Sequence, residues 1–456
     1  MSDIDKIDFG IGAAQQERHL RDFFYRSTSF ELACSEKTYL ILGPKGAGKS
    51  AIFQMLGELQ NEVKIFQMPS RWVGDEPQLR DHWNTIHSIT DSRVALWRFY
   101  LASLIAERLL EEDTLPDKLQ KLYKRFLVRW GLVREVPTRW QALRTMKIKV
   151  GFGDYLSTEL PLKVPLGATE CDQVIYTADE WLNSQNGDLW LCLDSLDEVS
   201  LNGGTSDEVE DLLSNLMRAV GELIRLKRIR FKLFFRSDIY QALTYVNKDH
   251  FSAVKLELKW TKEDIAILLG HRLAVLHPEN KSAITYPLAL EWLNKVFDWG
   301  KHHHHGFEDV YDLFKDGNGD VLPRDFVNLC IEAQKLQQTF VKQGISEVAG
   351  KLISAAAVEG ALQRTAASKL SDFLQVFENF GETFKQLKGH KSRKFTRREL
   401  SEALGKKDPL DAQLVISELV RIGAIAVRDN FAVNRSDSFE IPPLYAIALN
   451  IGGKNE

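Results

Sequence analysis

A short glycine-rich segment near the N-terminus carries the clearest chemical signal in the chain. The sequence Gly43-Pro44-Lys45-Gly46-Ala47-Gly48-Lys49-Ser50 fits the pattern GxxxxGK[ST]. An apolar run precedes it, and helical spacing begins near Lys49. Glycines allow the backbone to aim several N–H groups at phosphate oxygens, and the start of a helix adds the positive end of its dipole. We therefore expect these residues, with Ala51, to form a phosphate-binding loop, or P-loop.

Two residues of this loop and one distant aspartate are expected to bind Mg²⁺-ATP. Lys49 would neutralise the β- and γ-phosphates, and the Ser50 hydroxyl would ligate Mg²⁺. Asp194 follows the apolar run Leu189 to Leu193, which is typical of a buried strand. Open α/β sheets bind ligands at the carboxyl ends of their strands, so Asp194 is the predicted second Mg²⁺ ligand.

Further residues could act on the γ-phosphate. Glu198, with Asp197 beside it, is placed to polarise the attacking water as a general base. Arg236 follows the apolar run Phe231 to Phe235 and could bond two oxygens of the γ-phosphate through its planar guanidinium. Arg324 begins another predicted helix and could reach the phosphates from there. For each of them the alternative is a capping contact or an ordinary ion pair.

The elements that must position these residues alternate between strands and helices, which predicts an α/β fold with a parallel sheet. Five strands are expected, at Tyr39 to Leu42, Val63 to Met68, Leu189 to Leu193, Phe231 to Phe235 and Ala253 to Leu258. Residues 71–186 exceed what one crossover needs. They are predicted to form an insertion, helical over 95–132 and a β-ribbon over 146–165.

The rest of the chain is predicted to be helical and to end in a winged helix-turn-helix. Thr261, with Asp264 in the first turn, would cap a helix. Near the C-terminus we expect helices at Thr396 to Leu404 and Asp411 to Ile422, then short strands near Ala424 to Val427 and Phe431 to Val433. The expected division is an N-terminal segment (1–30), an ATPase core (31–260), a helical lid (261–380) and a winged helix (381–456).

The composition is that of an ordinary globular protein. The 456 residues are 44% hydrophobic and 27% charged, with a net charge of −4. No run approaches the roughly 20 apolar residues that a bilayer span needs, and the N-terminus is acidic where a signal peptide is basic. We expect a cytoplasmic protein with no membrane partner and, because its cysteines are scattered, with reduced thiols.

A basic run from Lys385 to Arg398 is the best candidate for DNA contact, through Lys391, Arg393 and Lys394. The predicted recognition helix that follows carries acidic residues and only one arginine, which leaves protein contact or non-specific DNA binding open.

Residues Asp316 to Asp320 imitate the start of a Ca²⁺ loop, but Val321 stands at the loop's glycine position, so a turn is predicted. The tract His302 to His305 is interpreted as an exposed loop.

The segments GPKGAGKS, LWLCLDSLDEV, FFRSD, LKWTKEDI and LPRDF together resemble the STAND and origin-recognition branches of the AAA+-like (ASCE) ATPases. The resemblance covers most of the chain apart from the insertion, and the DSLDE stretch is similar to the STAND pattern. It implies a central parallel sheet, a helical lid and a winged helix. It also implies an ATPase that exchanges ADP for ATP, often oligomerises, and in prokaryotes is frequently linked to phage defence. An arginine acting from a neighbouring subunit would be Arg228 or Arg230.

Three functions remain open on the sequence. The first is an ATP-hydrolysing switch that forms a homo-oligomer or binds an effector protein. The second is a DNA-binding loader or regulator that uses the winged helix. The third is a scaffold whose nucleotide is structural. No C-terminal repeat sensor is evident, so partner recognition would fall to the insertion, the winged helix or another chain.

Overall fold

The computed structural model describes residues 3–12, 14–17, 19–58, 92–129, 168–194, 196, 206–245, 248–276, 284–300, 306–344, 350–406, 408–429 and 431–452. The chain forms two compact units. The first comprises Met1–Glu31, Gly43–Ala51 and Leu258–Glu456, and the second comprises Leu32–Leu42 and Ile52–Glu257. The P-loop therefore belongs to the first unit.

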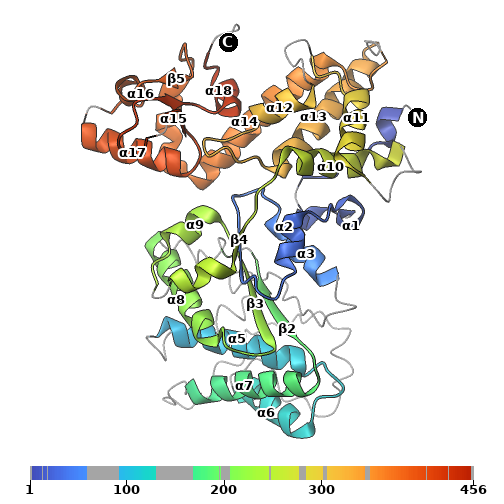
Figure 1. Ribbon diagram of the computed structural model, residues 1–456, viewed down its shortest axis with the longest axis vertical. Helices are drawn as coiled ribbons and strands as arrows, with labels where there is room; N and C mark the ends of the chain where they lie inside the picture. Colours follow the sequence, from blue (N-terminus) through green and yellow to red (C-terminus); the bar gives the residue numbers. More distant parts are fainter. Residues whose placement is uncertain are drawn as a thin grey trace, which may run out of the picture. The chain divides into compact units, whose positions relative to one another are not determined.

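The second unit is built on a parallel sheet (Figure 1). Its described strands are β1 (Leu40–Leu42), β2 (Leu189–Leu193), β3 (Ile229–Phe235) and β4 (Lys255–Glu257), in the order β2-β3-β1-β4. Every residue of β1 and β2 is buried, as expected for strands covered on both faces. Leu42 pairs with Phe235 and Leu193 with Leu233, so β1, β2 and β3 end at one edge. The α/β fold with a parallel sheet is confirmed.

Helices cover this sheet, and the first three of them lie within residues 71–186, the predicted insertion. They are α5 (Arg93–Leu109), α6 (Asp117–Arg129), α7 (Ala168–Ser184), α8 (Ser206–Leu223) and α9 (Ser237–Ala242), and η5 (Lys248–Val254) precedes β4. The Ser92 hydroxyl caps α5, and Trp97 Nε1 donates to Leu212 O at 2.8 Å, which ties α5 to α8. Helices α5 and α6 occupy most of residues 95–132, the span predicted to be helical. The predicted strand at 63–68 and the ribbon at 146–165 lie outside the described residues.

The first unit is helical around the P-loop. The N-terminal segment contains η1 (Asp3–Lys6), η2 (Ala14–Gln16), α1 (Leu20–Phe23) and α2 (Thr28–Ala33), and α3 (Lys49–Glu58) begins at the P-loop. After β4 come α10 (Lys262–Leu273), η6 (Ala274–Leu276), α11 (Tyr286–Val296), α12 (Phe307–Leu313), α13 (Pro323–Lys342) and α14 (Ala355–Val376). Thr261 and Asp264 form the predicted capping box. None of the described helices is long and apolar enough to cross a membrane.

The C-terminal region, residues 381–452, has a small antiparallel sheet and an apolar core that also includes Phe373 and Phe380. After η8 (Glu378–Phe380) its elements are α15 (Gly381–Leu387), β5 (Lys394–Phe395), α16 (Arg397–Ala403), α17 (Pro409–Arg421), β6 (Ala426–Val427), β7 (Phe439–Glu440) and α18 (Pro443–Leu449). Its strand order is β5-β7-β6. Thr396 caps α16 and Asp408 caps α17, so the two predicted helices are confirmed to within a few residues.

The strand predicted near Phe431 to Val433 is wrong. The N–H groups of Arg435 and Ser436 donate to Ala432 O at 2.7 and 2.9 Å, which is a turn, and the strand that pairs with β6 is β7. The Asp429 carboxylate accepts the N–H of Phe431 and of Asp437 at 3.2 and 3.1 Å and folds the loop around itself. The apolar alternation there does not report a buried face, because Phe431 is 64% exposed.

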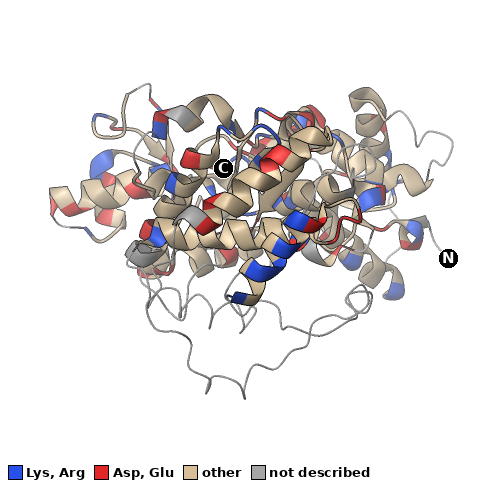
Figure 2. Cartoon of the chain, turned by 90° about the horizontal axis from the view of Figure 1, so that it is seen from below, with Lys and Arg blue, Asp and Glu red and all other residues tan. Residues whose placement is uncertain are grey.

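Charged residues of both signs lie beside one another on most described elements (Figure 2). Helix α6 differs from this pattern, because its charged residues are basic apart from Asp117. It buries Tyr123, Phe126 and Leu127 in the core of the second unit and turns its lysines outward. Arg129 at its end forms an ion pair with Glu170. This helix therefore has the character of a solvated amphipathic helix.

Candidate nucleotide-binding site

The P-loop has a backbone that only glycine adopts without strain. Gly46 and Gly48 have φ angles of +93° and +95°, and these left-handed values cost other residues about 1–2 kcal/mol each. Ala47 N–H donates to Pro44 O at 3.2 Å, which closes a turn inside the loop. The loop then runs into α3, whose first residue is Lys49. This is the strand, glycine turn and helix start that phosphate binding requires.

Lys49 folds over the loop it belongs to. Its Nζ donates to Gly43 O at 2.8 Å and to Pro44 O at 3.0 Å. Phosphate oxygens, which are charged, make stronger acceptors for an ammonium than these neutral carbonyls do. Ser50 is the second residue of α3 and is partly buried. The donor set of the loop therefore fits a nucleoside triphosphate.

Trp260 lies against the P-loop and was not identified from the sequence. Its indole Nε1 donates to Ala47 O at 2.8 Å, and a Cβ added at Gly48 would lie 3.4 Å from its Cζ2. Its own carbonyl accepts a hydrogen bond of 3.0 Å from Tyr311 in α12. The sequence feature that could have identified it is its position directly before the capping box of α10. That position holds the indole at the start of a well-defined helix.

Arg324, which was predicted to reach the phosphates, contacts the P-loop through the stem of its side chain. A Cβ added at Gly46 would lie 3.3 Å from Arg324 Cβ and 3.5 Å from its Cδ, so the stem of the arginine packs on this glycine. Arg324 Nε donates to Gly12 O at 3.2 Å. The structure thus brings the N-terminal segment, the P-loop and the start of α13 together.

The N-terminal segment passes Gly12 in an ordered turn. Gly10 and Gly12 have φ angles of +75° and +76°. The Glu17 carboxylate accepts the N–H of Ile11 at 2.8 Å. Ile11 is 53% exposed, although Phe9 beside it is buried. Ile11 is thus an exposed apolar side chain beside Gly12, the residue whose carbonyl accepts the bond from Arg324.

The other predicted site residues lie in the second unit. Asp194 follows β2 directly and is only 5% exposed. Arg236 precedes α9 and forms a bidentate pair with Asp238, at 2.6 Å through Nη2 and 3.2 Å through Nε. Because β2 and β3 are parallel neighbours, Asp194 and Arg236 emerge at the same edge of the sheet. Asp197 and Glu198 lie outside the described residues.

Arg228 and Arg230 lie at the other end of β3 and make local contacts. Arg228 Nη2 donates to Asn186 Oδ1 at 2.7 Å, which holds the turn between α7 and β2. Arg230 Nη1 donates to Leu226 O at 2.7 Å. These contacts give both residues a structural role within the chain.

Lys232 is a buried charge that the sequence did not reveal. It is 0% exposed in the middle of β3, and its Nζ donates to the carbonyls of Ala33, Ser35 and Thr38. It also lies 4.3 Å from the centre of the Trp190 ring. Burial lowers the pKa of Lys232 to about 8. This ammonium fastens the segment before β1 to the sheet.

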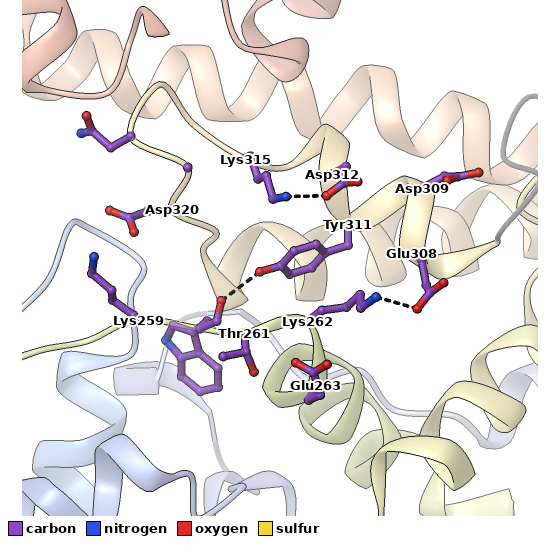
Figure 3. Close-up of a pocket in the computed structure, with 13 residues that line it drawn as sticks. Lys259, Thr261, Lys262, Glu263, Glu308, Asp309, Tyr311, Asp312, Lys315 and Asp320 are labelled. Atoms are coloured by element: carbon purple, nitrogen blue, oxygen red, sulfur yellow. Dashed lines mark hydrogen bonds and ion pairs between the residues drawn. The ribbon is translucent and has the colours of Figure 1, made fainter. Parts of the chain in front are cut away.

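A pocket of about 700 Å³ is lined by Trp260, by the first residues of α10 and by residues of α12 and of the loop that follows it (Figure 3). Ion pairs of 2.6 Å join Lys262 to Glu308 and Lys315 to Asp312 on its walls. Figure 3 also shows the hydrogen bond from Tyr311 to Trp260 O between these pairs. The walls mix charges of both signs, which does not match the uniformly positive lining of a phosphate site.

The predicted DNA-contacting residues differ in their surroundings. Lys391 and Lys394 are exposed, whereas Arg393 Nε lies 3.0 Å from Glu440 Oε1 in an internal ion pair. On α17, Leu410 and Leu414 are each 71% exposed. The outer face of this helix is therefore apolar and acidic at its start, where a DNA-reading helix usually carries polar or basic side chains.

Comparisons with known proteins give structural likenesses at low identity. A scan of protein-family models finds no match, and a search of curated proteins finds no significant match. The ORC2 protein of Aeropyrum pernix, in ADPNP-ADP complexes, is 12% identical over 95% of this chain and 97% of its own, with a TM-score of 0.38. The ORC1 protein of the same organism, in complex with DNA, is 13% identical over 95% and 94%, with a TM-score of 0.31. Cdc6p from Pyrobaculum aerophilum is 12% identical over 90% and 85%, with a TM-score of 0.28.

Proposed function

We propose that the chain is a Mg²⁺-dependent ATPase that works as a molecular switch. The observation that carries this proposal is the P-loop, in which Gly46 and Gly48 are left-handed and Lys49 begins α3. Arg324 and Trp260, from α13 and from the residue before the α10 cap, both lie against this loop. A phosphate-binding loop in contact with a helical region is the arrangement that a nucleotide-dependent switch needs.

Each residue has a distinct part in this proposal. Backbone N–H groups of the P-loop and Lys49 would hold the phosphates, and Ser50 and Asp194 are the side chains that would ligate Mg²⁺. Bound ATP supplies the transferable phosphoryl group. Glu198, assisted by Asp197, orients the attacking water and takes its proton. Arg236 and Arg324 respond to the γ-phosphate, and for Arg236 this requires exchanging its pair with Asp238 for phosphate oxygens.

The resemblance to STAND and origin-recognition ATPases extends the proposal to assembly. Nucleotide exchange would change the contacts of the helical region and favour an oligomer or an effector complex, and phage defence is the setting this resemblance suggests. A glutamate that activates water can be replaced by glutamine without losing ATP binding. Glu198→Gln should therefore hold an ATP-bound, assembled form.

Phosphate release and light scattering test this proposal together. The wild type should show slow turnover with Mg²⁺-ATP, and Lys49→Ala should show none. Glu198→Gln should lose turnover yet keep ATP and gain mass by light scattering. Turnover that is unchanged in Lys49→Ala would contradict the site assignment. Binding of ATP without any turnover in the wild type would instead support the scaffold function.

A second candidate function is a DNA-binding loader or regulator. The elements of the C-terminal region run α15, β5, α16, α17, β6, β7, which is the order of a winged helix-turn-helix. Lys388, Lys391 and Lys394 are exposed beside β5 and could follow a phosphate backbone.

Fluorescence anisotropy with a DNA duplex at low and moderate salt tests this candidate. The double reversal Lys391→Glu and Lys394→Glu should weaken binding and flatten its salt dependence. Lys342→Glu, on an exposed lysine of α13, is the matched control and should bind as the wild type does. Arg393 is left intact because it pairs with Glu440. Equal binding by the double variant and the control would rule out this surface.

A further inference from the structure

The loop between α12 and α13 is closed by one carboxylate. Asp316 Oδ1 accepts the N–H groups of Asn318 and Asp320, each at 2.9 Å. The N–H of Gly319 donates to Asp316 O at 3.0 Å, and the N–H of Asp316 donates to Asp320 O at 3.0 Å. The loop is therefore cross-linked at both ends and should move as one piece. We name residues 316–325, from this loop to the start of α13, the connector.

The loop end of the connector docks on the C-terminal region through backbone contacts. The N–H of Gly317 donates to Gly423 O at 2.7 Å. A Cβ added at Gly317 would lie 2.4 Å from Ile425 O, and one added at Gly423 would lie 2.8 Å from Asp316 Oδ2. Contacts this close leave no room for any side chain on either glycine. Gly423 lies two residues after the end of α17, in the turn that leads to β6.

The helix end of the connector contacts the P-loop. Arg324 packs on Gly46 and donates to Gly12 O. Its neighbour Asp325 forms an ion pair of 2.6 Å with Lys369 of α14, and both side chains are about nine-tenths buried. Val321, between the two ends, is 3% exposed. Because this segment is closely packed, a shift of Arg324 should be passed on to the docked loop.

A second contact joins the P-loop to the element that leads into the connector. Trp260 bonds Ala47 O through its indole and Tyr311 through its carbonyl. Tyr311 belongs to α12, which ends at Leu313, three residues before Asp316. Figure 3 shows Tyr311 and Asp320 facing the same pocket from α12 and from the connector. The P-loop is thus linked to both sides of the docked loop, directly through Arg324 and indirectly through Trp260 to Tyr311.

From these contacts we propose that the connector transmits the nucleotide state of the P-loop to the turn after α17. Phosphates that bind the P-loop change the contacts of Gly46 and Ala47, and hence the positions favoured by Arg324 and Trp260. The cross-linked loop carries this change to Gly423 and shifts the exposure of α17 and β6. This inference rests on the proposed nucleotide binding and names the route by which that binding is read out.

Hydrogen exchange on the full chain, with and without Mg²⁺ and a non-hydrolysable ATP analogue, tests the inference. In the wild type the analogue should protect residues 43–58 and change exchange in residues 409–427 by about fivefold or more, the usual lower range for coupled sites. Gly317→Ala places a Cβ 2.4 Å from Ile425 O, so the docking must break. The Gly317→Ala variant should still show protection of residues 43–58 by the analogue, but it should lose the change in exchange at residues 409–427. Gly381→Ala, where a Cβ meets nothing within 4 Å, is the matched control and should keep both.

Asn318→Ala is a second, milder variant, used in case Gly317→Ala does not fold. It adds no atom and removes only the 3.4 Å hydrogen bond from Asn318 Nδ2 to Arg421 O. It should reduce the response at 409–427 without abolishing it. A full response at 409–427 in Gly317→Ala would overturn the inference. Protection of the P-loop alone in the wild type would overturn the coupling and leave nucleotide binding intact. No response at either place would refute nucleotide binding, and the inference with it.

Discussion

Replacing Asp316 by asparagine should change how stability depends on pH. Burial raises the pKa of the Asp316 carboxyl from 3.8 to about 6, against the opposing effect of hydrogen bonds from Asp320 and Asn318 and of the Lys369 charge. A raised folded-state pKa means that the folded protein binds more protons than the unfolded chain. The stabilisation is therefore fully present below the unfolded pKa and is lost as the pH rises through about 6.

The expected size of the effect follows from these two pKa values. Between about pH 7.5 and about pH 5, protonation of Asp316 adds about 1.4 kcal/mol to the free energy of unfolding. Asparagine retains one oxygen for the N–H groups of Asn318 and Asp320 and does not titrate. As the pH falls over this interval, the free energy of unfolding of the wild type should therefore rise by about 1.4 kcal/mol relative to that of Asp316→Asn.

Urea unfolding followed by circular dichroism at several pH values measures this difference. Comparing the two proteins at each pH removes the contributions of all other titrating groups. A difference that stays constant between pH 7.5 and 5, or that changes in the opposite direction, would refute the argument that the carboxylate is buried against Gly423.

Three other substitutions test the surroundings of the P-loop and the sheet. Trp260→Phe keeps an aromatic ring but loses the 2.8 Å bond to Ala47 O, so ADP affinity measured by calorimetry should fall about fivefold, and an unchanged affinity would deny Trp260 its role. Gly48→Ala forces alanine to a φ of +95° and should weaken ADP binding about tenfold while leaving the circular dichroism spectrum unchanged. Lys232→Met leaves three carbonyls without their donor and should lower the free energy of unfolding by roughly 2–4 kcal/mol, so a thermal melt equal to that of the wild type would contradict the buried ammonium.

Features that depend on short-range chemistry were predictable from the sequence. The bounds of β2 agree with the structure because an uninterrupted apolar run is what a strand buried on both faces requires. The Thr261 capping box is a local arrangement of two side chains and the backbone. Pro323 predicted the start of α13, and the helix begins at that residue.

Features that depend on contacts between distant segments were not predictable. Lys232 interrupts an apolar strand, and only the fold shows the carbonyls that receive its charge. Phe431 alternates with Val433 as a strand would, yet the loop folds around Asp429. Asp316 to Asp320 was correctly interpreted as a turn. Its docking on Gly423 is invisible in the sequence, because the two segments are separated by α13, α14 and most of the C-terminal region.

The measurement that tests the central claim most directly is calorimetric titration of the full chain with Mg²⁺-ATP and with ADP. The wild type should bind one nucleotide, and Lys49→Ala should bind at least about tenfold more weakly, because a hydrogen bond to a charged group contributes about 1.5–3 kcal/mol. Lys37→Ala, on an exposed lysine before β1, is the matched control and should bind as the wild type does. No binding by the wild type, or equal affinity in Lys49→Ala, would contradict the assignment of Gly43 to Ala51 as a nucleotide-binding loop.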